Sequence, residues 1–223
     1  MLKGLLFDLD GVIADTARFH LAAWNRVAES LGITLPPAAN DALRGRSRQA
    51  SLDLILNYGP GANHFSADEK AALAAKKNTE YLQAIATLTP ADILPGVPQL
   101  LDDAQAAGLQ LAIASASKNA PAILAKLGIA DRFSAIVDPA QLQHGKPDPE
   151  IYLKAQALLG LAANEVVSFE DASAGVAAIK AAGQFAVGIG DATVLAAADL
   201  VVPSTADLKL ATITAAFNRE VSA

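Results

Sequence analysis

The chain of 223 residues is long enough for one large α/β domain or for a core domain with a small insert. Its 17 basic and 23 acidic residues give a net charge of −6, which argues against a nucleic-acid-binding surface, because such a surface needs a basic face. The chain has no cysteine, which excludes disulfides, thiolate catalysis and zinc–thiolate sites. We find no secretory leader and no apolar run of membrane-helix length, and we expect a cytoplasmic protein.

An apolar run at residues 3–8 predicts a buried strand at the start of the chain. Five further runs predict strands at 109–114, 135–137, 166–169, 185–189 and 200–202. Helix-length segments lie between them, at 97–107, 119–127, 149–159, 173–182 and 191–197. Strands that alternate with helices predict an α/β fold with a doubly wound parallel sheet, covered on both faces.

Residues 15–91 interrupt this alternation, because they contain no convincing strand. Helices are predicted there at 17–31, 39–45, 47–58 and 66–88. Ser66 and Glu69 have the spacing of a capping box, and Gly59-Pro60-Gly61 breaks the preceding helix. We therefore predict a Rossmann-like core formed by residues 1–14 and 92–223, with an α-helical cap inserted at 15–91.

Two acids, Asp8 and Asp10, end the first predicted strand and are followed by Gly11. Like charges in a partly desolvated place are unfavourable unless a cation or a shared proton compensates them. Mg²⁺ takes oxygen ligands and is often shared with a phosphate. The first dozen residues therefore suggest phosphate chemistry at a metal site.

Other polar groups follow the second and fourth predicted strands or lie in adjoining loops. If the strand order is 3-2-1-4-5-6, the first, second and fourth strands are neighbours, and these groups lie close to Asp8 and Asp10. A carboxylate of this group could attack phosphorus, and the second carboxylate could exchange the substrate's proton. Ser115 and Lys146 could hold phosphate oxygens. Asp8, a carbonyl and the Glu170-Asp171 pair could hold a metal.

These motifs resemble those of the haloacid-dehalogenase-like superfamily of phosphoryl-transfer enzymes. The matching segments are FDLDGV at 7–12, ASAS at 114–117, KPDP at 146–149 and FEDASAG at 169–175. The resemblance implies that Asp8 is the nucleophile and Asp10 the general acid/base. It also implies Mg²⁺ among Asp8, the Asp10 carbonyl, Glu170 and Asp171.

Two features of the predicted cap are open to more than one interpretation. Thr16, His20 and Trp24 recur every four residues and therefore lie on one helix face. This face is either a functional stripe or the edge of a helix at an interface. The segment RGRSR at 44–48 is either a solvated turn that caps a helix at Ser47 or a phosphate clamp. Lys76, Lys77 and Asn78 are typical of an exposed helix face.

The cap features are similar to those of the β-phosphoglucomutase branch of the superfamily. In that branch Thr16 and His20 would position Asp10 and couple it to cap closure, and Arg48 would bind the distal phosphate. Arg44 stands where the pattern has lysine, and Arg46 where it has a small apolar residue. The resemblance implies substrate-binding roles for Trp24, Arg44, Gly45, Arg46, Ser47, Arg48, Ser51, Lys77, Ala116, Ser117, Lys118 and Asn119.

The expected reaction interconverts β-glucose 1-phosphate and glucose 6-phosphate through an aspartyl phosphate and a 1,6-bisphosphate. One alternative is a sugar-phosphate phosphatase of the same superfamily, and another is a mutase or phosphatase for a different hexose phosphate. A third alternative is a non-enzymatic phospho-acceptor domain, although Asp10 and the cap argue against it. We expect sugar phosphates as the only partners, with no nucleic acid and no membrane, and a monomeric state.

Overall fold

A six-stranded parallel sheet forms the centre of the computed structural model, which describes residues 1–221, except for the side chains at 41 and 221. The strand order is β3-β2-β1-β4-β5-β6, which is the order under which the polar groups after the strands were expected to meet. The strands are β1 (Gly4–Phe7), β2 (Gln110–Ile113), β3 (Ala135–Ile136), β4 (Val166–Glu170), β5 (Phe185–Ile189) and β6 (Leu200–Val202). Strand order reverses beside β1, so the switch point of the sheet lies where the acidic motif begins.

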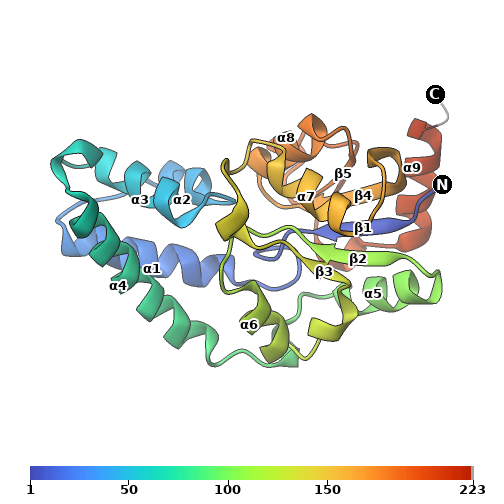
Figure 1. Ribbon diagram of the computed structural model, residues 1–223, viewed down its shortest axis with the longest axis horizontal. Helices are drawn as coiled ribbons and strands as arrows, with labels where there is room; N and C mark the ends of the chain where they lie inside the picture. Colours follow the sequence, from blue (N-terminus) through green and yellow to red (C-terminus); the bar gives the residue numbers. More distant parts are fainter. Residues whose placement is uncertain (222–223) are drawn as a thin grey trace.

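Helices cover both faces of the sheet (Figure 1). They are α5 (Val97–Ala106), α6 (Ala120–Lys126), α7 (Glu150–Leu158), α8 (Ser173–Ala181) and α9 (Leu210–Val221). Leu5 and Phe7 of β1 pack in a buried cluster with α5, α6 and α9, whereas Leu6 packs with α7 and α8. Successive residues of a strand point to opposite faces, so a strand covered on both sides is apolar throughout.

Four helices between β1 and α5 form a separate group, drawn on the left of Figure 1. They are α1 (Ala17–Ser30), α2 (Pro37–Leu43), α3 (Arg48–Asn57) and α4 (Ala67–Ile85). Ser66 and Glu69 form the predicted capping box at the start of α4. A small apolar cluster around Trp24, Val27, Leu52 and Ile55 holds these helices together. We use the word cap for this helical group.

The predicted helix at 191–197 is wrong, because this segment is a series of turns. The Asp191 side chain accepts hydrogen bonds from the backbone of Thr193 and Val194, which favours a turn over a continued helix. Helix α9 was not predicted from the sequence. Short 3₁₀ helices lie at Ala62–His64, Pro90–Asp92, Ala130–Arg132, Pro139–Gln141, Ala163–Glu165 and Thr205–Asp207. No helix within residues 1–221 has the length and apolar character needed to cross a membrane.

Candidate active site

Three carboxylates meet at the carboxyl end of the sheet. Asp8 follows β1, Glu170 ends β4 and Asp171 follows it; one oxygen from each lies within 4.8 Å of the others. The register explains their meeting, because Phe7 is paired with Phe169 in the adjacent strand. This group therefore has the donor chemistry of a hard divalent cation such as Mg²⁺, which prefers carboxylate oxygens.

Lys146 supplies a buried positive charge to the same group. Its Nζ lies 2.7 Å from Asp8 Oδ1 and also contacts Glu170 Oε1. Burial disfavours the charged amine, but the charges of Asp8 and Glu170 raise the pKa of Lys146 above its usual value. Tyr152 donates a further hydrogen bond to Glu170 Oε1 at 3.0 Å. The lysine is therefore held charged against the proposed nucleophile.

The acidic group remains short of positive charge despite Lys146. Burial and the neighbouring charges of Glu170 and Asp10 raise the pKa of Asp8, although Lys146 acts against this. Burial and Glu170 likewise raise the pKa of Asp171 to about 7, although Arg44 and Lys146 oppose the shift. A divalent cation would favour the charged carboxylates, so the residues present fit a metal ion.

Two glycines make room for these carboxylates. A Cβ on Gly175 would lie 1.9 Å from Glu170 Oε1, and a Cβ on Gly11 would lie 2.2 Å from Asp171 Oδ2. Gly11 also has a φ of +86°, which other residues rarely adopt. These positions require glycine because the carboxylates of Glu170 and Asp171 occupy the space that a side chain would need.

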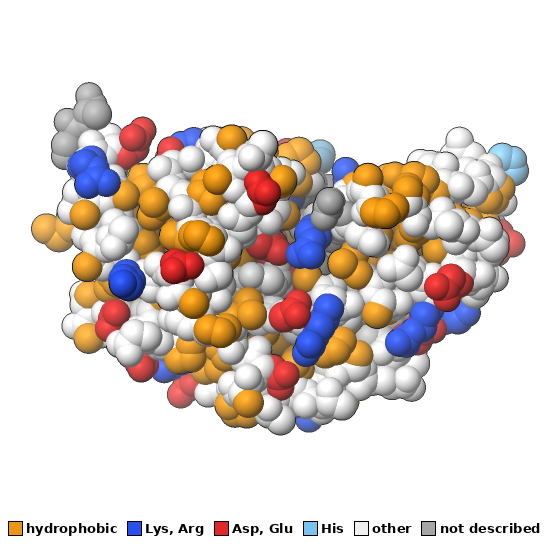
Figure 2. Space-filling model, turned by 180° about the vertical axis from the view of Figure 1, so that it is seen from behind, with side chains coloured by type: hydrophobic (Ala, Val, Ile, Leu, Met, Phe, Trp, Pro, Cys, Tyr) orange, Lys and Arg blue, Asp and Glu red, His pale blue; other side chains and the backbone are white. Residues whose placement is uncertain are grey.

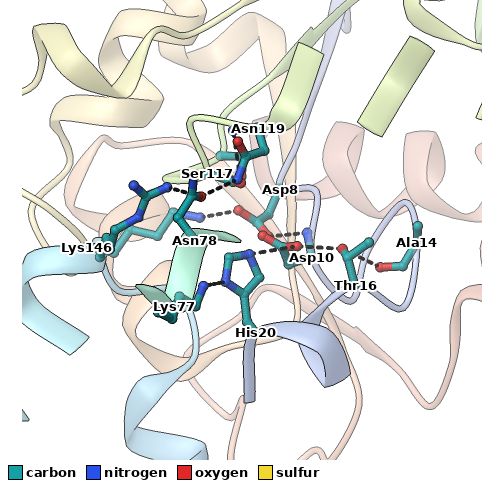
Figure 3. Close-up of polar contacts among 12 residues, drawn as sticks. Asp8, Asp10, Ala14, Thr16, His20, Lys77, Asn78, Ser117, Asn119 and Lys146 are labelled. Atoms are coloured by element: carbon teal, nitrogen blue, oxygen red, sulfur yellow. Dashed lines mark hydrogen bonds and ion pairs between the residues drawn. The ribbon is translucent and has the colours of Figure 1, made fainter. Parts of the chain in front are cut away.

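Asp10 has different partners from Asp8. Its backbone N–H donates to Asp8 Oδ2 at 3.0 Å, and Thr16 Oγ donates to Asp10 Oδ1 at 2.5 Å. The Asp10 side chain does not belong to the three-carboxylate group, so a metal would meet Asp10 only through the predicted backbone carbonyl. Figure 3 shows Asp10 between Asp8 and the Thr16 and His20 side chains. This places a second carboxylate beside the first with a separate set of hydrogen bonds.

His20 connects Asp10 to a buried lysine of the cap (Figure 3). Lys77 Nζ lies 2.5 Å from His20 Nδ1, and His20 Nε2 lies 3.6 Å from Asp10 Oδ1. When Lys77 is charged, its ammonium group only donates, so Nδ1 is then the acceptor and the histidine proton lies on Nε2, facing Asp10. Burial lowers the pKa of His20 to about 4 and that of Lys77 to about 7, so His20 is neutral near pH 7.

The prediction that residues 76–78 form an exposed helix face is correct only for Lys76. Lys77 is 2% exposed, and its Nζ lies 5.1 Å from the centre of the Trp24 ring and 4.6 Å from that of Tyr81. Asn78 is half-buried and accepts hydrogen bonds from Arg48 at 2.7 Å and from Asn119 at 3.2 Å. The packing of α4 against α1 buries this part of the helix.

The segment 44–51 of the cap reaches the core at two places. Arg44 Nη1 lies 3.0 Å from Asp171 Oδ2, and a Cβ on Gly45 would be 3.7 Å from the Lys146 side chain. Ser47 caps α3, as one of the two interpretations of this segment expects, because its side chain accepts a hydrogen bond from the backbone N–H of Ala50. Arg48, through Asn78, is joined to Asn119 of the core. Cations of the cap therefore stand at both the acidic group and the Asn119 loop.

A cavity of about 290 Å³ lies between the cap and the core. Basic and acidic side chains gather along the seam between these two parts of the molecule (Figure 2). The predicted site residues that line the cavity are Asp8, Asp10, His20, Trp24, Arg44, Gly45, Arg46, Ser47, Arg48, Ser51, Lys77, Ala116, Ser117, Lys118 and Asp171.

Five predicted site residues lie outside the cavity lining: Thr16, Ser115, Asn119, Lys146 and Glu170. All five contact lining residues: Thr16 bonds Asp10, Lys146 bonds Asp8, the Ser115 hydroxyl accepts from the Ser117 backbone at 3.1 Å, and Asn119 N–H donates to Ser117 Oγ at 3.3 Å. The Glu170 carboxylate accepts a hydrogen bond from the backbone N–H of Asp171 at 3.0 Å. All five therefore support the cavity wall from behind.

Sequence reasoning missed several residues of the site. Leu21, Gln49 and Pro139 line the cavity, and Tyr152 and Tyr81 lie behind it. One signal for Tyr81 was available, because it lies four residues after Lys77 and so shares its helix face. No comparable sequence spacing connects Tyr152 with Glu170.

The parallel sheet, the helical cap and the carboxylates at the switch point define a phosphoryl-transfer class of enzyme. The chain matches the family model of haloacid dehalogenase-like hydrolases over residues 2–183, and it belongs to this family. It is 46% identical to the β-phosphoglucomutase of Bacillus subtilis over 209 residues, which cover 94% of this chain and 92% of the relative.

Solved structures and other curated proteins extend this comparison. A crystal structure of β-phosphoglucomutase from Clostridium difficile has a TM-score of 0.98 and 41% identity, with complete coverage of both chains. A phosphorylated carbohydrates phosphatase of Thermotoga maritima is 30% identical over 186 residues, which cover 82% of each chain. The similarity to mutases is therefore higher than the similarity to this phosphatase.

Proposed function

We propose that this enzyme is a β-phosphoglucomutase, which interconverts β-D-glucose 1-phosphate and D-glucose 6-phosphate. The observation that carries the proposal is a pair of cationic regions on two sides of one cavity, one at Asp8 and one at Arg48. Lys146 stands against Asp8 in the core, and Arg48 is joined to Asn119 through Asn78 of the cap. A mutase needs one region for the phosphoryl group in transfer and another for the phosphate that stays on the sugar, whereas a hydrolase of a monophosphate needs only the first.

The first half-reaction starts from an enzyme whose Asp8 carries a phosphoryl group. The 6-hydroxyl oxygen of β-glucose 1-phosphate attacks that phosphorus, the bond from phosphorus to Asp8 breaks, and Asp10 takes the hydroxyl proton. The products are β-glucose 1,6-bisphosphate and free Asp8. The 3.0 Å hydrogen bond from the Asp10 backbone to Asp8 keeps the two carboxylates adjacent for this exchange.

The second half-reaction uses the same groups in reverse. The bisphosphate turns so that its 1-phosphate faces Asp8, whose oxygen attacks phosphorus. The bond from phosphorus to the C1 oxygen breaks, and Asp10 returns its proton to that oxygen. Glucose 6-phosphate leaves, and Asp8 is phosphorylated again. During each half-reaction Arg48, Ser117, Lys118 and Asn119 would hold the phosphate that does not react.

The metal ion of the proposed enzyme is Mg²⁺. Asp8, Glu170, Asp171 and the Asp10 carbonyl would hold it, and it would supply positive charge that offsets repulsion between the carboxylates and phosphate. Lys146 provides positive charge at Asp8 Oδ1 and Glu170 Oε1 from within the protein. Ser115, which is buried and accepts a hydrogen bond from the Ser117 backbone, would hold the transferring phosphoryl group together with Lys146.

Water is the competitor of the sugar hydroxyl, because it can hydrolyse an aspartyl phosphate. The cap segment 44–51 approaches the core at Asp171 and Lys146 and would limit access of water to Asp8. Thr16 and His20 contact Asp10 from the junction between core and cap. We propose that they hold Asp10 away from water-activating positions until sugar is bound.

The proposed division of the chain follows the same logic, with a core of residues 1–14 and 92–223 and a cap of residues 15–91. A cap that moves as a unit is compatible with a monomer, which we also propose, together with a cytoplasmic location.

The covalent mechanism is tested by Asp8→Asn, which keeps the size of the side chain but removes the nucleophile. We expect the purified variant to convert no β-glucose 1-phosphate into glucose 6-phosphate when Mg²⁺ and a trace of the 1,6-bisphosphate are present. Asp53→Asn, a change in the cap outside the cavity lining, serves as a control and should retain activity. Wild-type-like turnover by Asp8→Asn would refute the aspartyl-phosphate mechanism.

A further inference from the structure

Tyr81 is a fully buried residue of α4 that the proposed mechanism does not use. Its side chain is 0% exposed, and its ring centre lies 3.9 Å from that of His20 at an interplanar angle of 31°. Lys77 Nζ lies 4.6 Å from the centre of the same ring. The apolar cluster of the core includes Tyr81, so this cap residue is inserted into the core at the junction of the two parts.

The hydroxyl of Tyr81 is buried without a hydrogen bond of acceptable geometry among residues 1–221. The hydroxyls of Ser117 and Thr16 are near enough to lower the pKa of Tyr81, but burial and the charge of Asp10 act more strongly and raise it. Tyr81 therefore stays protonated and can donate. A buried hydroxyl with no partner is unfavourable and rare in folded proteins, so its retention calls for an explanation.

The two neighbouring hydroxyls have the complementary hydrogen-bonding capacity. Thr16 Oγ gives its proton to Asp10 Oδ1, so its lone pairs can accept a proton from Tyr81. Ser117 Oγ accepts from the Asn119 backbone and keeps its own proton to donate. A small movement of the cap would then complete a continuous chain from Ser117 through Tyr81 and Thr16 to Asp10.

The other unbonded polar atom at this junction supports such a movement. His20 Nε2 is also buried without a hydrogen bond and lies 3.6 Å from Asp10 Oδ1, slightly too far for one. The Thr16 hydroxyl is held at the core by its hydrogen bonds to Asp10 and to the Ala14 carbonyl. His20 of α1 and Tyr81 of α4 are stacked, so one movement of these two helices relative to that hydroxyl can bring His20 to Asp10 and Tyr81 to Thr16 together.

We propose that Tyr81 is a positioning residue for the proposed mutase reaction, whose hydroxyl joins Ser117 of the core to Thr16 and thereby fixes the orientation of Asp10 when the cap closes. The proposal rests on the proposed function for its substrate. Hydrogen bonds in such a chain strengthen one another, so the middle member affects Asp10 although it does not touch the sugar.

The test is Tyr81→Phe, which keeps the ring and removes only the hydroxyl. We expect kcat for β-glucose 1-phosphate to fall about tenfold, the effect of about one hydrogen bond in the transition state, while KM stays within about twofold. The melting temperature should be unchanged or higher, because the variant loses a buried group that had no partner. Tyr58→Phe, at an exposed tyrosine after α3, is the matched control and should change neither value.

Two results would overturn the proposal. One is a kcat for Tyr81→Phe within twofold of the wild type; the other is a lower melting temperature with a parallel rise in KM, which would indicate an ordinary packing role. The wild type is assayed alongside for both glucose 6-phosphate and free phosphate. If the wild type releases only phosphate, the proposed mutase function fails, but the same comparison of kcat is then made on phosphate release, because Asp10 transfers the proton in either reaction.

Discussion

Arg44 Nη1 lies 3.0 Å from Asp171 Oδ2, so a cation of the cap contacts a carboxylate of the proposed metal group. This contact joins cap and core at the point where the metal would bind. The Arg44 side chain is 36% exposed, which keeps the interaction modest. Arg44 and a metal ion would both be attracted to the same carboxylate.

We expect Arg44→Gln to bind Mg²⁺ more tightly than the wild type. The ion pair between Arg44 and Asp171 is partly exposed and contributes about 1 kcal/mol, so its removal corresponds to about a fivefold lower Kd for Mg²⁺. Isothermal titration calorimetry without substrate measures this directly. Arg46→Gln removes the same charge from a neighbouring residue, whose Nε contacts the Ala42 carbonyl within the cap, and controls for the overall change in charge. Equal metal affinities of the two variants would show that Arg44 does not compete for Asp171.

The distal-phosphate assignment predicts a binding defect in Arg48→Ala. The variant should raise KM for β-glucose 1-phosphate at least tenfold, because a charge-assisted hydrogen bond to phosphate contributes about 1.5–3 kcal/mol. Steady-state kinetics provide the value. Arg26→Ala removes an arginine of α1 that pairs with Glu80 outside the cavity and should leave KM unchanged. An unaltered KM in Arg48→Ala would remove Arg48 from the phosphate site.

Gly175→Ala should disturb the metal site through Glu170. The added Cβ would lie 1.9 Å from Glu170 Oε1, so this buried side chain must move and lose its contact with Lys146. We expect a loss of roughly 2 kcal/mol in the free energy of unfolding, together with weaker Mg²⁺ binding. Urea denaturation and calorimetry test both effects. Ser173→Ala, at an exposed position of the same helix, is the control. Unchanged stability and metal affinity in Gly175→Ala would contradict the packing described for Glu170.

The buried neutral His20 predicts a specific acid sensitivity. Its pKa is about 4 in the folded protein and near 6.5 in an unfolded chain. Between these values the unfolded chain binds a proton that the folded chain does not, so stability falls as the pH decreases from 6.5 toward 4.

His20→Gln removes this dependence. When the pH is lowered from 7 to 4.5, the unfolding free energy of the wild type should fall by about 2 kcal/mol more than that of His20→Gln. Urea denaturation at the two pH values gives the difference, and exposed His64→Gln is the control. A pH-independent difference would mean that the pKa of His20 is the same in the folded and unfolded protein, which would contradict its burial in the neutral form.

The fold and the acidic motif were predictable because they depend on local patterns. The apolar run that ends at Asp8 and the run that ends at Glu170 each define a strand and place a carboxylate at its end. The strand order was then sufficient to bring these carboxylates together, as the pairing of Phe7 with Phe169 confirms.

The environment of α4 was not predictable in the same way. Lys76 and Lys77 are adjacent and chemically identical, yet one is exposed and the other is 2% exposed beneath Trp24 and Tyr81. Their difference arises from the packing of α4 against α1, a tertiary contact that helical periodicity alone does not define. The contact of Arg44 with Asp171 likewise depends on how the cap lies on the core.

The central claim is that the phosphoryl group returns to the sugar rather than to water. Phosphorus NMR of one sample, with β-glucose 1-phosphate, Mg²⁺ and a trace of β-glucose 1,6-bisphosphate, observes both outcomes together. The account predicts that the 1-phosphate signal is replaced by that of glucose 6-phosphate, with little inorganic phosphate. Stoichiometric release of inorganic phosphate without glucose 6-phosphate would contradict it.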